Sequence, residues 1–439
     1  MNLLQSLIAE FHERPIAPFT PRSGSLPEAP SHANVLIGMR RSGKTYRLFQ
    51  EMDRLLSAGV PKKHLLHVNF EDERLGAIGV KMMGELLETF YRGSPDARSR
   101  RSYLFFDEIQ NVPQWERFVR RVLDTEDARV YLTGSSAKLL STEVATALRG
   151  RCLTTEVLPY GYAEFLAHAG TEVPVTLPGA RMRSTLEAAT LDYLTKGGFP
   201  AVQRLTEGER IGLLQDYVEL VVFRDVVERH GVGNFQALRY LVRHLLDSCA
   251  RPFSINKSCN DLKSQGLAVG KDTLHAYLAH LADAFLVFTV PIYRRSYRAR
   301  LVNPRKVYAI DPGLARAMSH SAASDVGALL EDAVYLELRR RTGRTREGSI
   351  SYVLTRGGHE VDFAVDRGES LELVQVCADV SDPGTLGREV RALVEAKAET
   401  GAGSAVIVTL HGDRVVDTAA GPIRVVPAWR WMLGLVEPR

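Results

Sequence analysis

The sequence predicts an α/β protein whose first domain is built on a parallel β-sheet. Gly38, Gly43, Lys44 and Thr45 fill the pattern G-x-x-x-x-G-K-S/T, with an apolar strand-like run before it and a helix-like run after it. A second apolar run, residues 103–107, ends in two adjacent carboxylates. Ligands of parallel sheets bind beyond the carboxyl ends of the strands, so both motifs are expected at one edge of the sheet.

The glycine-rich stretch has the strand–loop–helix context of a phosphate-binding loop, or P-loop. Glycines let the backbone N–H groups face the phosphate oxygens, and the helix N-terminus adds positive partial charge. We expect Lys44 to reach the β- and γ-phosphates and the Thr45 hydroxyl to bind Mg²⁺. The alternative is a chance match in a turn, against which the flanking strand and helix argue. The predicted nucleotide-binding residues are Gly38, Arg41, Ser42, Gly43, Lys44 and Thr45.

The paired carboxylates are Asp107 and Glu108. Phosphoryl transfer needs a metal ion that neutralises charge and a group that orients the attacking water. We expect Asp107 to hold a water on Mg²⁺ and Glu108 to polarise the attacking water. Many strands end in Asp–Glu by chance, but the position downstream of a P-loop favours the catalytic interpretation. The implied cofactors are ATP and Mg²⁺.

Ser135 and Ser136 follow a further strand-like run, Arg129 to Thr133. Their hydroxyls are placed to sense the γ-phosphate or the attacking water, and Ser135 is the candidate catalytic residue. An ordinary helix N-cap is an equal alternative.

Arg149 and Arg151 follow the next helix-like segment. Either could act as an arginine finger that stabilises transition-state charge on a neighbouring subunit, or both could be surface residues. The sequence does not choose between them. Arg224 is a further candidate, although an i, i+4 salt bridge with Glu228 is the more ordinary interpretation.

The bulk composition fits a multidomain globular protein. A chain of 439 residues is expected to hold more than one core, and a net charge of +4 does not by itself indicate nucleic-acid binding. The four cysteines form no C-x-x-C pair, which suits a reducing cytoplasm, and no apolar run approaches the ~20 residues of a membrane span. We expect an N-terminal helix and linker (1–30), an ATPase core (31–159), a helical lid (160–232), a winged helix (233–318) and a tail domain (325–439).

The winged helix is predicted from three helix-like segments followed by two strand-like runs. The connector between the two runs is basic, and a basic wing can contact phosphates of DNA or RNA. The alternative is a winged helix that binds protein and keeps a solvated basic loop. The candidate nucleic-acid contacts are Arg294, Arg295, Arg298 and Arg300, with Arg305 and Lys306 beside them.

The tail domain has the order helix, three strands, helix, strand, which is the core order of restriction-endonuclease-like folds. Such enzymes need carboxylates and a lysine to hold Mg²⁺ and water. Glu331, Glu360 and Asp362 can supply acids, but Gln375 and Cys377 stand where Glu and Lys are expected. A thiol cannot supply the lysine's positive charge to a scissile phosphate. We therefore favour a degenerate nuclease domain over an active one.

With these residues in place, the chain resembles the bacterial and archaeal AAA-type P-loop ATPases that carry a winged helix and a C-terminal restriction-endonuclease-like domain. The resemblance covers almost the whole chain and rests on GMRRSGKT, VNFEDERL, LFFDE, LTGSSAKLL, ALRGR, GGFP, LADAFLVF, NPRKVYAID and GHEVDF. It implies ATP binding at Gly43, Lys44 and Thr45, and hydrolysis by Asp107 and Glu108. It also implies an oligomer, such as a hexameric ring, in which the Arg149–Arg151 region acts in trans.

The leading hypothesis is an oligomeric, cytoplasmic ATPase motor that binds and remodels DNA. A second hypothesis is a nucleotide-gated regulatory or defence/toxin-like ATPase that binds a protein partner. A third is an ATP-regulated nuclease built on Glu331, Glu360 and Asp362.

Overall fold

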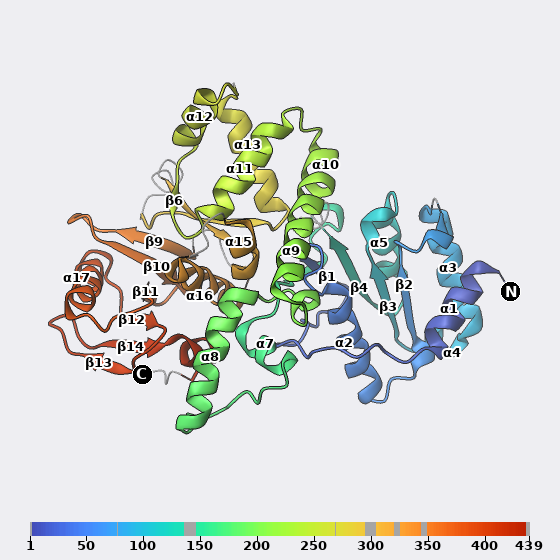
Figure 1. Cartoon of the computed structure of the whole chain (residues 1–439). Helices are drawn as coiled ribbons and strands as arrows, with labels where there is room; N and C mark the ends of the chain where they lie inside the picture. Colours follow the sequence, from blue (N-terminus) through green and yellow to red (C-terminus); the bar gives the residue numbers. More distant parts are fainter. Residues whose placement is uncertain are drawn as a thin grey trace. The chain divides into compact units, whose positions relative to one another are not determined.

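The computed structural model describes residues 2–76, 78–135, 146–267, 269–294, 304–319, 325–343 and 349–435. The chain divides into two compact units, Met1–Leu158 and Pro159–Arg439. Figure 1 labels their helices and strands.

The first unit is organised by a five-stranded sheet with the order β2-β3-β4-β1-β5. All of its strand pairs are parallel, which confirms the predicted α/β core. The strand order matters for the site, because β4 lies between β1, which precedes the P-loop, and β3, which ends in the paired carboxylates. The strands are β1 (Ala33–Gly38), β2 (Leu65–Asn69), β3 (Ser102–Asp107), β4 (Ala128–Ser135) and β5 (Cys152–Glu156).

Helices cover both faces of this sheet. On one face, Leu48 and Met52 of α2 pack with Phe105 in a buried apolar cluster. On the other face, the ring of Phe118 in α5 meets the ring of Phe106 at 5.9 Å between centroids. The helices are α1 (Leu3–Glu13), α2 (Lys44–Ser57), α3 (Val80–Gly93), α4 (Pro95–Ser99) and α5 (Trp115–Thr125), with short 3-10 turns at Lys62–His64, Glu73–Leu75 and Ile109–Asn111.

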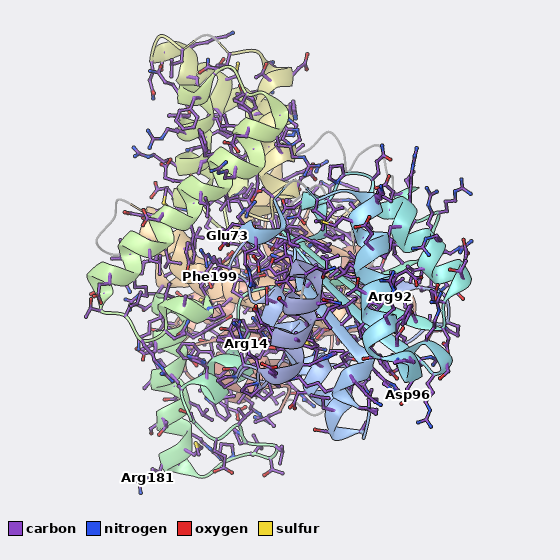
Figure 2. All side chains as sticks on the ribbon, turned by 90° about the vertical axis from the view of Figure 1, so that its right-hand side faces the viewer. Arg14, Glu73, Arg92, Asp96, Arg181 and Phe199 are labelled. Carbon is purple, nitrogen blue, oxygen red and sulfur yellow. The ribbon has the colours of Figure 1, made fainter. Side chains whose placement is uncertain are left out.

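The N-terminal helix α1 docks at the edge strand β2 and against α3. Its apolar residues Leu4 and Ile8 are buried, and His12 Nε2 lies 3.0 Å from the Leu65 carbonyl oxygen. The outer sides of α3 and α4 carry exposed charged residues, among them Arg92 and Asp96 (Figure 2). The N-terminal helix thus packs on β2 and α3 of the first unit.

The second unit begins with helices. They are α7 (Tyr162–His168), α8 (Ala180–Lys196), a 3-10 turn (Pro200–Val202) and α9 (Glu207–Val221), which continues through a π-helical turn (Val222–Val227) into α10 (Glu228–His230). Arg224 lies in the π-helical turn and pairs with Glu228 at 3.1 Å, which is the ordinary interpretation of this arginine.

A three-helix segment with a small antiparallel sheet follows. The helices are α11 (Phe235–Asp247), α12 (Ile255–Ser264) and α13 (Lys271–Asp283), and the strands are β6 (Pro252–Phe253), β7 (Val287–Val290) and β8 (Arg305–Ala309), in the order β6-β8-β7. Lys306 contradicts the prediction that it decorates a basic wing, because its side chain is only 1% exposed. Side chains alternate between the two faces of a strand, so Lys306 and Tyr308 of β8 point to the same side. Both bind the Glu331 carboxylate.

The last part of the unit is a six-stranded sheet with the order β13-β14-β12-β11-β10-β9. β9, β10 and β11 form an antiparallel meander, and β11, β12 and β14 are parallel. The sequence analysis missed β13, β14 and α18. The elements are α15 (Pro312–Met318), α16 (Val326–Thr342), β9 (Ile350–Leu354), β10 (Glu360–Asp366), β11 (Leu371–Val376), α17 (Pro383–Thr400), β12 (Ser404–Thr409), β13 (Arg414–Val416), β14 (Ile423–Pro427) and α18 (Ala428–Met432).

Candidate nucleotide-binding site

The P-loop connects β1 to α2 by a backbone that only certain residues can adopt. Gly38 has φ 151° and Gly43 has φ 102°. A Cβ atom added at Gly38 would lie 2.3 Å from the Val157 carbonyl oxygen, so a side chain cannot be accommodated there. The exposed Arg41 also has a positive φ, 66°, as expected for a tightly curled loop.

The polar atoms inside the loop fit a phosphate ligand. Lys44 is buried, and its ammonium group donates hydrogen bonds to the carbonyl oxygens of Gly38 at 3.1 Å and Met39 at 3.0 Å. The buried Ser42 hydroxyl has no hydrogen-bond partner among the described residues. Buried polar atoms normally find partners, so a cation and an unpartnered hydroxyl in one curled loop are what an anionic ligand would satisfy.

Arg22 holds the P-loop from the N-terminal side. Its guanidinium donates to the Ser42 carbonyl oxygen at 2.5 Å and to the Leu158 carbonyl oxygen at 3.0 Å. Its backbone N–H and carbonyl bind the Gln50 side chain of α2 at 2.9 and 3.0 Å. The sequence analysis treated this stretch as linker and missed Arg22, because no local pattern marks an arginine that acts on a distant loop.

The motifs of β1 and β3 meet in one hydrogen-bonded chain. The Thr45 hydroxyl donates to Asp107 Oδ2 at 2.8 Å. The other oxygen of Asp107 accepts a hydrogen bond from the Thr133 hydroxyl, and the Thr133 oxygen accepts from the Glu108 N–H at 3.0 Å. Thr45, Asp107, Thr133 and Glu108 thus form a connected set, which we call the carboxylate chain. Thr45 and Asp107 place two oxygen ligands side by side, the donor type that Mg²⁺ prefers.

Burial and hydrogen bonding act on the pKa of Asp107 in opposite directions. Burial raises the pKa of Asp107, while the hydrogen bonds from Thr133 and Thr45 oppose the shift. Glu108 has a left-handed backbone (φ 53°), and its carboxylate accepts a hydrogen bond from the Gln110 side chain. A non-glycine residue in this conformation is typical of functional turns.

Thr133 was missed by the sequence analysis, which chose Ser135 and Ser136 on the same segment. The register of β4 against β3 pairs Leu132 with Phe106, so Thr133 is the next residue, beside Asp107. The backbone of Ser135 ends β4, but its side chain and the whole of Ser136 lie outside the described residues. Strand register is the signal that identifies Thr133, and it depends on pairing between strands distant in sequence.

The two arginine candidates differ in their surroundings. Arg151 forms an ion pair with Asp124 of α5. Arg149 is exposed and has a left-handed backbone (φ 54°). Exposed ion pairs are weak, so the pair with Asp124 orients Arg151 without removing it from consideration.

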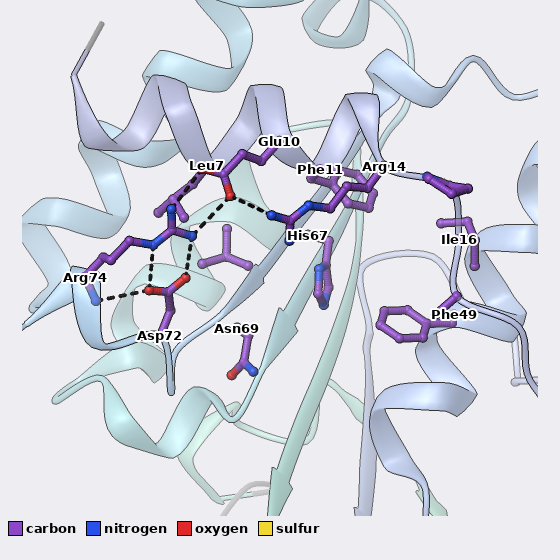
Figure 3. Close-up of a pocket in the computed structure, with 13 residues that line it drawn as sticks. Leu7, Glu10, Phe11, Arg14, Ile16, Phe49, His67, Asn69, Asp72 and Arg74 are labelled. Atoms are coloured by element: carbon purple, nitrogen blue, oxygen red, sulfur yellow. Dashed lines mark hydrogen bonds and ion pairs between the residues drawn. The ribbon is translucent and has the colours of Figure 1, made fainter.

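A groove of about 340 Å³ lies between α1, α2 and β2. His67 of β2 sits between the rings of Phe11 and Phe49, at centroid distances of 5.5 and 5.6 Å (Figure 3). The rim is a chain of ion pairs in which Arg74 binds Asp72 and Glu10, and Glu10 also binds Arg14. These contacts hold α1 on the edge of the sheet.

The residues expected in the tail domain are also brought together. Glu331, Glu360 and Asp362 all bind the ammonium group of Lys306. Gln375 lies beside them and accepts a hydrogen bond from the Asp362 N–H at 3.3 Å. The described residues contain no group of three or more His, Cys, Asp or Glu side chains arranged to hold a metal ion.

Of the candidate nucleic-acid contacts, only Arg294 is described, and it donates to the Tyr293 carbonyl oxygen at 3.1 Å. Arg295, Arg298 and Arg300 lie outside the described residues. No helix within the described ranges is long and apolar enough to cross a membrane.

Residues 30–166 match the family described as AAA domain, and residues 188–325 match a domain of unknown function (DUF8612). The uncharacterized protein MJ1544 of Methanocaldococcus jannaschii is 35% identical over 417 residues, which cover 92% of this chain and 89% of that protein. The chain belongs to the same family as this archaeal protein. The N-terminal unit of the chain is an AAA-type P-loop ATPase domain.

More distant similarities were also found. An uncharacterized protein of Haemophilus influenzae is 27% identical over 348 residues, covering 79% of this chain and 83% of that protein. A solved structure of a Walker-type ATPase from Pyrococcus abyssi is 14% identical, covers 72% of this chain and 94% of that chain, and has a TM-score of 0.42. A score of this size adds nothing to the assignment of function.

Proposed function

We propose that the chain is a Mg²⁺-dependent ATPase that works as an oligomer on DNA. The observation that carries the ATPase part is the carboxylate chain, which joins the P-loop helix to β3 through Thr45 and Asp107. In this proposal Lys44 exchanges its loop carbonyls for the β- and γ-phosphates, and Glu108 orients the attacking water. Mg²⁺, held by Thr45 and Asp107, would neutralise phosphate charge.

An oligomer is proposed because an exposed arginine downstream of β4 could stabilise transition-state charge in the site of a neighbouring subunit. Arg149 is our choice for the arginine finger, since it is exposed whereas Arg151 is oriented by Asp124. A finger acting in trans predicts complementation. Mixing inactive Lys44→Ala chains with inactive Arg149→Ala chains should restore part of the ATPase activity, and a mixture as inactive as its components would contradict the proposal.

DNA is the proposed partner because α11, α12, α13 and the β7–β8 pair follow the order of a winged helix, and the connector between those strands is rich in arginine. Phosphate contacts by clustered arginines supply affinity without sequence specificity. The tail domain is proposed to be restriction-endonuclease-like in fold.

The decisive experiment measures ATP turnover with single-stranded, duplex and junction DNA. We expect at least one DNA to raise the rate several-fold at low salt and to lose its effect as salt increases. Lys44→Ala should abolish turnover, and Lys63→Ala, a surface lysine paired with Asp96, should leave it unchanged. Turnover that no DNA changes, together with no DNA binding at low salt, would overturn the DNA part and leave the ATPase part intact.

A second candidate function is a nucleotide-gated switch that binds a protein partner. The burial of Lys306 favours this second function, because a buried lysine is not available to contact the phosphates of DNA. It predicts slow, DNA-independent turnover and a partner that is retained in one nucleotide state only.

A further inference from the structure

Four ionisable side chains of the second unit meet at one point, and we call them the acid–lysine cluster. Lys306 Nζ lies 2.9 Å from Glu331 Oε1, 2.7 Å from Glu360 Oε1 and 2.9 Å from Asp362 Oδ1. The acids come from α16 and β10 of the tail domain, whereas the lysine comes from β8 of the preceding small sheet. One cation therefore binds three carboxylates across two parts of the chain.

The geometry suits an ammonium ion. A lysine has three N–H donors, and here each carboxylate can take one of them. The distances are those of charge-assisted N–H···O bonds and exceed the roughly 2.0–2.1 Å of Mg²⁺–oxygen bonds. Two further hydrogen bonds hold these acids. Tyr308 donates at 2.7 Å to Glu331 Oε1, the oxygen that also binds Lys306, and the Val376 N–H donates to Asp362 Oδ2 at 2.9 Å.

The lysine is enclosed and stays charged. Its side chain is 1% exposed, and those of Asp362, Glu331 and Glu360 are 8%, 13% and 37% exposed. Burial alone lowers the pKa of Lys306, but the carboxylates of Asp362, Glu331 and Glu360 together outweigh it and raise the pKa. The cluster thus has its own permanent cation.

A divalent metal ion, which the restriction-endonuclease resemblance implies for these acids, does not fit the residues present. The ammonium group stands where the carboxylates converge, and a metal ion there would meet like charge. Gln375 places a neutral amide where the nuclease pattern expects a glutamate. Its Nε2 donates to Glu389 at 2.8 Å. Lys306 also cannot supply the missing nuclease lysine, because an enclosed ammonium group cannot touch a scissile phosphate.

We infer that Lys306 is the resident cation of this centre, which takes the place of a divalent metal ion and joins β8 to α16 and β10 as an ionic lock. The residue that precedes β8 is also held to the tail domain, since the Tyr352 hydroxyl of β9 donates to the Pro304 carbonyl oxygen at 2.8 Å. The centre is therefore structural, and metal-dependent cleavage of DNA is absent from this domain.

The test removes the cation and asks whether a metal ion replaces it. Full-length wild type and Lys306→Met are titrated with Mn²⁺ without nucleotide, and free Mn²⁺ is measured by electron paramagnetic resonance. We expect Lys306→Met to bind one Mn²⁺ per chain more than wild type, at least tenfold tighter than any wild-type site. The additional Lys306→Met/Asp362→Asn variant should lose it. Lys397→Met is the matched control, since this tail-domain lysine donates to the Ala420 carbonyl oxygen instead of an acid.

Three results would overturn the inference. The first is equal Mn²⁺ binding by wild type and Lys306→Met. The second is a wild-type Mn²⁺ site that Asp362→Asn abolishes, which would mean that metal displaces the lysine. The third result needs no Lys306 variant. It is that the wild-type protein nicks plasmid DNA with Mg²⁺ or Mn²⁺ and that Asp362→Asn abolishes this nicking. If Lys306→Met is insoluble without metal, its recovery by Mn²⁺ but not by added NaCl counts as support, and failure of both overturns it.

Discussion

The hydroxyl of Thr133 is the best single test of the carboxylate chain. Thr133 is fully buried, and its hydroxyl joins Asp107 to the Glu108 N–H. Thr133→Val keeps the shape and removes both hydrogen bonds. Each buried partner left unsatisfied costs about 1–3 kcal/mol. We expect the two losses to lower the free energy of unfolding by about 2–6 kcal/mol.

The same change should act on catalysis more than on binding. The Thr133 hydroxyl binds the Asp107 carboxylate and the Glu108 N–H. We therefore expect kcat to fall about 10–100-fold while the Kd for ATP changes less than about threefold. Steady-state turnover and equilibrium binding of a fluorescent ATP analogue measure the two effects. Thr133→Ser retains the hydroxyl and should recover most of the rate.

Thr409→Val is the matched control, because it deletes a buried hydroxyl that donates to the Ala378 carbonyl oxygen in the six-stranded sheet. Wild-type turnover by Thr133→Val, or equal damage by Thr133→Ser, would refute the reasoning.

Three further changes probe the same unit. Gly38→Ala should abolish ATP binding and lower the melting temperature, because its Cβ would lie 2.3 Å from a carbonyl oxygen, whereas Gly84→Ala, with open space around it, should do neither. Arg22→Met should weaken ATP binding about 3–10-fold by releasing the P-loop carbonyl of Ser42, and the exposed control Arg92→Met should not. Burial lowers the pKa of His67 from 6.5 to about 4, so the unfolded state takes up a proton before the folded state does. The free energy of unfolding should therefore fall by about 3 kcal/mol as the pH drops from 6.5 to 4, and His67→Gln should remove this part of the acid sensitivity. An unchanged pH profile in His67→Gln, measured by urea unfolding, would contradict that assignment.

The sequence by itself determined the ATPase core. The P-loop residues Gly38 to Thr45 and the pair Asp107–Glu108 could be predicted because phosphate binding and metal binding impose residue types at fixed local spacings. The strands around them could be predicted since each is a short apolar run, and the parallel arrangement follows from the helices between them.

Only the tertiary structure decided the contacts that link distant segments. Thr133 rather than a neighbouring serine meets Asp107 because of the register between β3 and β4, and Arg22 reaches the P-loop because the N-terminal segment folds back on α2. Lys306 was assigned to an exposed wing from its basic neighbours, yet it is buried among the acids of the tail domain. A lysine in solvent and a lysine held by three carboxylates have the same local sequence signal. What separates them is which strands pair and which face of β8 turns inward, and those are set by long-range packing.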